Sequence, residues 1–233
     1  MTGPTQIPMD LPLPVSRSGA DFLTSPSNQT AWDAMQRWQD WPDTRLVLTG
    51  PEGSGKSHLV QIWAGSTRAA ITEASDLTEA RMAHLIAAPA IAVEDVDAIC
   101  DLTGPVRRQV ETTLFHLYNL AAAERVPLLM TGRAAPAHWD LTLPDLASRV
   151  LAMAHVRIAE PDDALLTSIL RKLFRDRQMN VAEDVLDYLI WRIERSFASA
   201  ERIVARLDQV ALASKRRITR QLAADVLAED TGA

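Results

Sequence analysis

The 233-residue sequence predicts an α/β fold, in which a domain with a five-stranded parallel sheet is followed by a small all-helical lid domain. Two observations predict the sheet. Short apolar runs alternate with segments of helical periodicity up to about residue 159, and a glycine-rich loop, residues 50–57, joins the first run to the next helix. Strands that alternate with helices pair in parallel through right-handed crossovers. A third observation predicts the lid, because only helical periodicity remains beyond Pro161.

The elements of the first domain follow from this alternation. The first helix follows the capping residues 25–30 and ends before Pro42. The later helices carry apolar residues three and four positions apart, over residues 57–64, 75–86, 105–123 and 143–150. The five strands are the short apolar runs at residues 45–49, 69–71, 90–93, 127–131 and 156–158.

The chain divides into three expected parts. Residues 1–20 contain four prolines, which exclude a helix or a central strand, so we expect a disordered tail there. Residues 21–159 form the base domain that carries the glycine-rich loop. Residues 160–233 form the lid, with one apolar face on each of four helices, over residues 163–177, 182–194, 199–214 and 219–227.

Composition excludes several classes of protein. A net charge of −6 argues against a large nucleic-acid-binding surface. The single cysteine, Cys100, rules out a disulfide framework or a thiolate metal site. The N-terminus lacks the basic and apolar regions of a signal peptide. The longest apolar stretch, residues 85–93, is too short to span a membrane. We therefore expect a cytoplasmic protein without membrane contact.

The glycine-rich loop is a complete G-x-x-x-x-G-K-[ST] pattern, which is typical of phosphate binding. Glycines let backbone N–H groups turn toward the phosphates, the lysine reaches the terminal phosphates, and the final hydroxyl ligates Mg²⁺. A strand before it and a helix after it are the required context. The alternative is an ordinary turn between strand and helix. The residues predicted to hold a nucleoside di- or triphosphate are Gly50, Pro51, Glu52, Gly53, Ser54, Gly55, Lys56 and Ser57.

Two acids follow the third predicted strand. Glu94 takes the position that usually ligates Mg²⁺ together with Ser57, and Asp95 takes the position that acts on the attacking water. An aspartate is usual at the first position, and the longer glutamate arm has to shift to keep octahedral Mg²⁺ geometry. We therefore expect a magnesium site that is weakened for hydrolysis. The alternative is an exposed acidic turn.

Several segments together resemble the AAA+ ATPases and, among them, the DnaA initiator family. The resemblance is closest to the Hda family, whose members are related to DnaA but lack its DNA-binding domain. It covers about residues 20–227. The segments that carry it are Phe22 with residues 26–29, residues 55–61, residues 130–133 and residues 146–149.

The resemblance implies roles for further residues. Asn28 and His58 belong to segments that adjoin the nucleotide, and Thr131 lies in the sensor 1 segment. In the lid, Arg202 is the candidate sensor 2 residue that binds the nucleotide, although the family's arginine position aligns with Glu201. We leave this choice open. A glutamate at that position would further reduce hydrolysis by this chain.

Arg149 matches the arginine-finger position of the family. Such an arginine crosses a subunit interface and stabilises charge on a neighbour's γ-phosphate. The resemblance therefore implies that Arg149 is catalytic in trans. The alternative is a surface arginine that pairs with Asp145 one helical turn earlier.

The tail carries a short pattern of its own. Gln6, Met9 and Leu11 match Gln-x-x-[Leu/Met]-x-[Leu/Phe], which resembles the peptide that binds the DNA polymerase sliding clamp. An extended peptide can place two apolar side chains in a pocket while the glutamine amide binds at its rim. The alternative is a proline-rich leader without a partner.

These features predict an adaptor that binds adenine nucleotide, ADP or ATP, with Mg²⁺ and has weak or no ATPase activity of its own. The resemblance implies two partners, the sliding clamp and DnaA, with little direct DNA binding. It also implies negative regulation of replication initiation, through hydrolysis of ATP bound to DnaA. Self-association stays open. The alternatives are an autonomous AAA+ ATPase of the helicase-loader type and a small-molecule P-loop kinase. The kinase would need a basic acceptor site, and the sequence has no such cluster.

Overall fold

A computed structural model describes residues 22–214 and 216–231 of the chain. The tail expected over residues 1–20 lies outside the described residues, and so do its motif residues Gln6, Met9 and Leu11. In the part that the structure describes, no helix is both long enough and apolar enough to cross a membrane.

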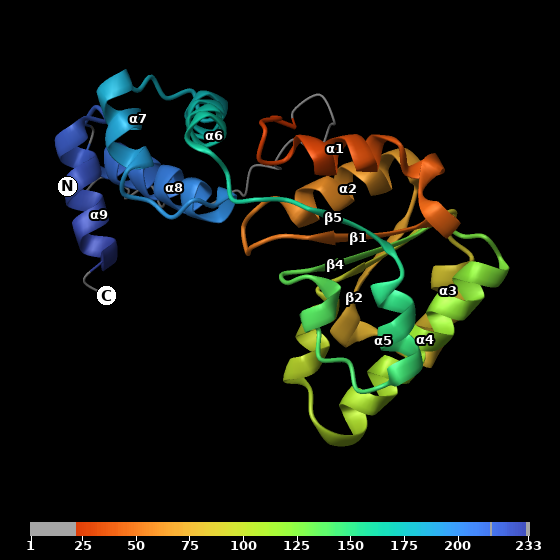
Figure 1. Cartoon of the computed structure of the whole chain (residues 1–233). Coiled ribbons are helices and arrows are strands. Elements are labelled where there is room, and N and C mark those ends of the chain that lie inside the picture. Colours follow the sequence, from red (N-terminus) through yellow and green to blue (C-terminus); the bar gives the residue numbers. More distant parts are fainter. Residues whose placement is uncertain (1–21, 215, 232–233) are drawn as a thin grey trace, which may run out of the picture.

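A five-stranded parallel sheet forms the centre of the first part of the chain, which confirms the predicted fold class (Figure 1). The strand order is β2-β3-β4-β1-β5, and every neighbouring pair is parallel. The last strand begins two residues earlier than expected, because Ala154 already pairs with Leu46 of the first strand. The strands are β1 Arg45–Thr49, β2 Ala70–Glu73, β3 Ile91–Glu94, β4 Leu128–Gly132 and β5 Ala154–Arg157.

Helices cover both faces of this sheet. Successive strand residues point to opposite faces, and two buried clusters follow that alternation. Leu46 and Leu48 pack with residues of α1 and α2, whereas Val47 belongs to the cluster formed with α3, α4 and α5. Figure 1 shows the two groups of helices on opposite sides of the strands. The helices are α1 Gln29–Gln36, α2 Lys56–Thr67, α3 Glu79–Ile86, α4 Gly104–Ala123 and α5 Pro144–Leu151.

The remaining helices form a separate bundle with its own apolar cluster, at the left of Figure 1. Each helix contributes buried residues to that cluster, among them Leu166, Leu189, Ile203 and Leu222. The Asp162 carboxylate starts the bundle, because its Oδ1 accepts a 2.8 Å hydrogen bond from Leu165 N at the first turn. The helices are α6 Asp163–Asp176, α7 Glu183–Ile190, α8 Phe197–Ser214 and α9 Arg220–Thr231.

Two helices are shorter than the sequence predicts. The helix expected from residue 75 starts as α3 at Glu79, because Leu77 and Thr78 are extended. The helix expected up to residue 194 ends at Ile190, where the Leu189 carbonyl accepts N–H bonds from both Arg192 and Ile193. The described residues also form 3₁₀ turns at Trp38–Asp40, Pro42–Thr44, Ala74–Asp76, Val96–Asp101 and Pro136–His138.

Trp139 anchors the loop between β4 and α5. It is the largest of the fully buried side chains among the described residues. Its indole N–H donates a 2.7 Å hydrogen bond to the Ala134 carbonyl. The ring lies directly against the backbone of Gly132, where an added Cβ would come within 2.7 Å of the ring carbon Cζ2. This packing holds the loop against the end of β4.

Replacing Trp139 by Ala should lower the free energy of unfolding by about 3–5 kcal/mol, because removal of this large buried side chain leaves a cavity in the core. Urea denaturation measures this change. The matched control is Trp191→Ala, since the Trp191 side chain is 75% exposed and its loss should change stability by less than about 0.5 kcal/mol. Equal costs for the two variants would contradict the packing described for Trp139.

Candidate functional site

The candidate site lies where the carboxyl ends of three neighbouring strands meet. The parallel order places β4 between β3 and β1, so segments that leave these strands reach the same edge of the sheet. The phosphate loop follows β1, the acidic pair Glu94 and Asp95 ends β3, and Arg133 follows β4. The structure therefore brings together the main predicted site residues from three separate parts of the chain.

The backbone of the phosphate loop requires glycine, for reasons that Gly55 and Gly50 illustrate. Gly55 has φ +99 and stands immediately before the first residue of α2. Gly50 is constrained by space, because an added Cβ would lie 2.6 Å from the Ile158 carbonyl oxygen. The loop consequently delivers the amino end of α2, with its free N–H groups, to the place where phosphates bind in such loops.

Lys56 holds its charge inside the loop. The side chain is buried, and its ammonium donates to the carbonyls of Gly50 at 2.7 Å and Pro51 at 2.9 Å. Burial lowers the pKa of Lys56, and the negative charges of Asp95 and Asp97 offset part of that effect. A buried ammonium surrounded by loop carbonyls is well placed to gain from contact with phosphate oxygens.

Ser57 and Glu94 provide a hydroxyl and a carboxylate suited to Mg²⁺. Burial raises the pKa of Glu94, and a hydrogen bond from the Ser57 side chain acts in the opposite direction. The Glu94 Oε1 atom is buried without a hydrogen-bond partner, which leaves an acceptor for a cation. In the described residues there is no group of three or more His, Cys, Asp or Glu side chains that could hold a metal. Mg²⁺ in nucleotide sites takes one or two protein ligands together with phosphates and waters, so these residues fit it.

Asp95 has its backbone fixed by Thr131. Asp95 adopts a left-handed conformation, with φ 52 and ψ 49. Its N–H donates a 3.0 Å hydrogen bond to Thr131 Oγ1, and Thr131 is fully buried. Thr131, predicted as the sensor 1 residue, therefore fixes the backbone of Asp95 through its hydroxyl group. Its direct role in catalysis stays a prediction.

Arg133 is a site residue that the sequence reasoning did not single out. Its backbone N–H donates a 2.8 Å hydrogen bond to Asp97 Oδ2. Its guanidinium lies 3.6 Å from Glu52 Oε2 of the phosphate loop, so a second cation stands at the mouth of the site beside Lys56. The available signal was its place directly after a buried strand that neighbours the phosphate-loop strand.

Asn28 shapes the segment that precedes α1. Its Oδ1 accepts from Ser25 N at 2.8 Å and its Nδ2 donates to Leu23 O at 2.9 Å, so both ends of the amide bind the segment's own backbone. The same segment places Phe22 against Trp32 and against the edge of the His58 ring, with ring centroids 4.7 and 5.6 Å apart. The predicted contacts of Asn28 and His58 with a nucleotide remain untested.

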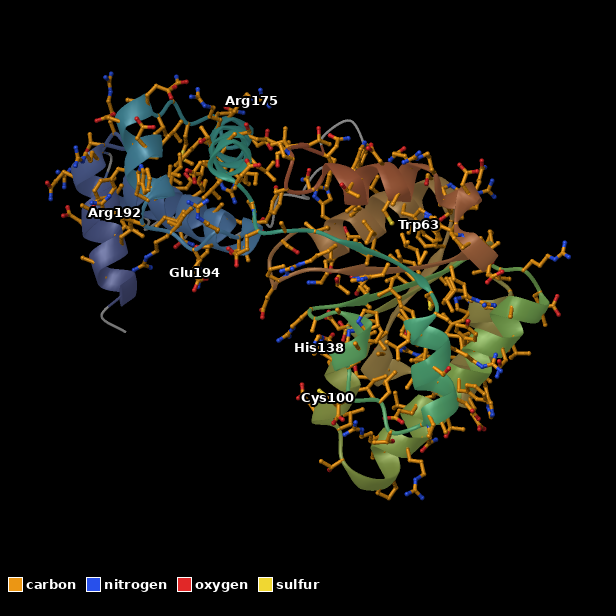
Figure 2. The ribbon with its side chains drawn as sticks, viewed as in Figure 1. Trp63, Cys100, His138, Arg175, Arg192 and Glu194 are labelled. Carbon is orange, nitrogen blue, oxygen red and sulfur yellow. The ribbon has the colours of Figure 1, made fainter. Side chains whose placement is uncertain are left out.

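The lid meets the phosphate loop at the start of α8. Phe197 N donates a 2.8 Å hydrogen bond to the Gly53 carbonyl, and the Phe197 ring lies against Gly55. Arg202, one turn further along α8, is exposed and lies 3.9 Å from Glu194, a residue labelled below α8 in Figure 2. Glu201 is also exposed. Whether Arg202 or Glu201 faces the phosphates stays open.

Arg149 is held by α4. Its guanidinium donates a 2.6 Å hydrogen bond to Asn119 Oδ1 and lies over the ring of Phe115, 5.0 Å from the centroid. This contact with α4 takes the place of the alternative surface pair with Asp145. The side chain itself is exposed.

Arg149 lies at the opposite end of the sheet from the phosphate loop. It is 5.5 Å from the ring centroid of Tyr118, whose hydroxyl accepts a 2.8 Å hydrogen bond from Arg45, the first residue of β1. The phosphate loop leaves β1 at its other end, after Thr49. Four steps of a strand span roughly 13 Å. Arg149 is therefore far from the candidate phosphate site of its own chain.

Comparisons with known proteins give one family match. Residues 163–227 match the family model described as Hda, lid domain.

Solved structures of replication initiators share the fold. Domain III of the Thermotoga maritima initiation protein DnaA has a TM-score of 0.77 at 18% identity, over 94% of this chain and 98% of that one. AMPPCP-bound DnaA from Aquifex aeolicus has a TM-score of 0.67 at 18% identity, over 81% of this chain and 64% of that one. A structure described as a DNA replication initiation factor has a TM-score of 0.71 at 17% identity, over 83% and 64% of the two chains. This chain thus spans less than two thirds of the last two. At these identities the likeness shows the AAA+ fold alone.

Replacing Lys56 by Ala should abolish binding of ADP, because Lys56 carries the buried ammonium inside the phosphate loop. Titration calorimetry of the purified protein with ADP measures the affinity. The control is Lys172→Ala on α6, which removes a lysine that pairs with Asp176 in the lid and should leave the affinity unchanged. Unchanged ADP affinity in Lys56→Ala would overturn the assignment of residues 50–57 as a phosphate site.

Proposed function

We propose that this chain, which is an Hda-like, DnaA-related AAA+ protein, acts as an adaptor that promotes hydrolysis of ATP bound to DnaA. The lid match over residues 163–227 and the DnaA-type fold confirm the resemblance that the sequence predicted. The proposal itself depends on one observation, the position of Arg149 at the end of the sheet opposite its own phosphate loop.

The position of Arg149 supports action in trans. An exposed guanidinium remote from the chain's own nucleotide can reach only a phosphate on another molecule. Its contacts with Phe115 and Asn119 orient it without neutralising its charge, since the ring and the amide are both uncharged. A cation presented in this way stabilises the charge that develops on a γ-phosphate during transfer. The catalytic role we assign to Arg149 is that of an arginine finger.

We further propose that the chain binds adenine nucleotide in its own phosphate loop. The amino end of α2 and Lys56 would hold the phosphates, and Ser57 with Glu94 would hold Mg²⁺. One DnaA relative is bound to the ATP analogue AMPPCP, which supports an adenine nucleotide here. Mg²⁺, when bound, would neutralise phosphate charge, while Asp95 would stand on the side of the attacking water. Glu94 in place of the usual aspartate favours slow turnover and retention of ADP.

The second partner that we propose is the sliding clamp, bound through Gln6, Met9 and Leu11. Such a tail would bring the adaptor to DNA without a large DNA-binding surface of its own, which agrees with the net charge of −6. Hydrolysis of DnaA-bound ATP would then act as negative regulation of replication initiation. The competing function is an autonomous ATPase. The observation that favours it is the hydrogen bond to Thr131 that fixes the backbone of Asp95, the residue expected beside the attacking water.

Replacing Gln6, Met9 and Leu11 together by Ala should abolish clamp binding and leave the melting temperature unchanged, because we expect the tail to lie outside the core. Surface plasmon resonance on immobilised clamp measures binding, and thermal denaturation measures stability. The matched control replaces Ile7, Pro8 and Asp10, the free positions of the same pattern, and should keep binding. Retained binding in the first variant, or a lowered melting temperature, would contradict the assignment.

Replacing Arg149 by Ala should reduce the stimulated hydrolysis of DnaA-bound ATP by about a thousandfold or more, because a finger contributes that much to phosphoryl transfer. The assay follows phosphate release from ATP-loaded DnaA in the presence of DNA-loaded clamp. ADP affinity of the variant should equal that of the wild type. Asp145→Ala is the control and should keep the stimulated rate. Normal stimulation by Arg149→Ala, or loss of its own nucleotide, would rule out the trans role. Turnover of the chain alone at the stimulated rate would favour the autonomous ATPase.

A further inference from the structure

We infer that Glu111 is a positioning residue for Arg149, because its buried carboxylate fixes the start of α5, the helix that carries Arg149. The inference rests on the proposed trans role of Arg149. It assigns to α4 the task of presenting that arginine at a set place on the surface.

The Glu111 carboxylate binds the two residues that directly precede α5. The N-cap residue of α5 is Leu143, which makes no side-chain cap hydrogen bond. Glu111 Oε2 accepts from Leu143 N at 2.8 Å and from Thr142 Oγ1 at 2.6 Å, and its Oε1 accepts from Thr142 N at 3.0 Å. Free N–H groups at a helix start favour a negative charge. A residue 31 positions earlier in the chain thus satisfies the entrance to α5.

Arg107 completes the arrangement. Its Nε donates to Glu111 Oε1 at 3.1 Å, and its Nη2 donates to the Asp140 carbonyl in the same loop. Glu111 is 1% exposed. Burial works against its ionisation, but the hydrogen bonds from Thr142, Arg107 and Leu143 outweigh burial and hold the pKa of Glu111 below its usual value. The carboxylate therefore stays charged and keeps its acceptors available at neutral pH.

Helix α4 also contacts α5 near its carboxyl end, at Arg149. Phe115 and Asn119 follow Glu111 by one and two turns of α4, so they lie on the same side of that helix. They are the residues that contact the Arg149 guanidinium. α5 has 8 residues and is therefore roughly 12 Å long. One face of α4 consequently fixes both the start of this short helix and the Arg149 side chain near its carboxyl end.

Fixing both ends determines where the guanidinium stands. If the entrance of α5 were released, buried Leu146 and Val150 would still hold the helix on the core, but its first turn would be free to shift and would no longer fix the position of the residues that follow. A displacement of about 1 Å in a group that contacts reacting atoms can cost about a hundredfold in rate. Glu111 would thus affect the reaction on the partner without touching either nucleotide.

The test uses the isosteric variant Glu111→Gln in the full-length protein. A glutamine presents an NH₂ group to one of the backbone N–H donors at Thr142 or Leu143, so at least one bond at the α5 entrance is lost. The assay titrates the protein into ATP-loaded DnaA with DNA-loaded clamp. It separates the maximal hydrolysis rate from the concentration that gives half of it. ADP affinity and melting temperature are measured on the same samples.

We expect a maximal rate lowered about 10- to 100-fold, with the half-saturating concentration and ADP affinity unchanged. The double variant Glu111→Gln/Arg149→Ala should be no slower than Arg149→Ala alone, because both act through one group. Thr142→Val removes the hydroxyl bond and keeps the backbone bonds. Thr142→Val should lower the maximal rate several-fold less than Glu111→Gln does. It replaces Glu111→Gln in the test if that variant does not fold.

The matched control is Asp162→Ala, which removes the carboxylate cap of another helix, α6 in the lid. It should lower the melting temperature yet keep the maximal rate. If Asp162→Ala slows the reaction as much as Glu111→Gln, or if Glu111→Gln also loses ADP, Glu111 contributes to stability only and the inference is wrong. If Glu111→Gln keeps the full rate while Arg149→Ala abolishes it, the inference fails and the proposed function stands. A full rate with Arg149→Ala would defeat the proposed function itself.

Discussion

The parallel pairing of β4 between β3 and β1 is the constraint on which the rest of the structure depends. It aligns three strand ends, so that the phosphate loop, the Glu94–Asp95 pair and Arg133 meet at one edge of the sheet. The same pairing sends the start of β1, with Arg45, to the opposite edge, where Tyr118 and Arg149 lie. One sheet thus separates the candidate phosphate site from Arg149 by the length of a strand. The function proposed above, in which the chain binds one nucleotide and acts on another, needs this separation.

Buried charges serve two different purposes in this structure. At the phosphate loop, Lys56 and Glu94 are both partly or fully buried, and burial disfavours the charged form of each, lowering one pKa and raising the other. Phosphate and Mg²⁺ would supply the missing counter-charges. At the start of α5, Glu111 is buried with its hydrogen bonds already satisfied by Thr142, Leu143 and Arg107. The first arrangement suits ligand binding, and the second suits rigid support.

Sequence reasoning worked best where chemistry is local. The succession of strands and helices along the chain depends on residues adjacent in the chain, and so does the place of the glycine-rich loop after β1 and of the two acids at the end of β3. The structure has these segments where the sequence predicts them. It worked less well for side-chain partners. Asp145 was a reasonable partner for Arg149 at a spacing of four, but α4 brings Asn119 from 30 residues away. Glu111 carried no signal at all, because an acid inside an amphipathic helix normally faces solvent. Arg133 had a signal only in its place directly after a buried strand.

By itself, the sequence determined the fold class, the glycine-rich loop between β1 and α2 and the change to a helical lid after Pro161. These follow from periodicity and from a motif whose spacing has one chemical meaning. The tertiary structure alone decided which helix supports α5, which residues lie around Lys56 and on which side of the sheet Arg149 stands. The physical reason is that these contacts join residues from separate elements, and the packing of helices on the two faces of the sheet selects them. Periodicity specifies which face of a helix is buried, but it does not specify what that face will meet.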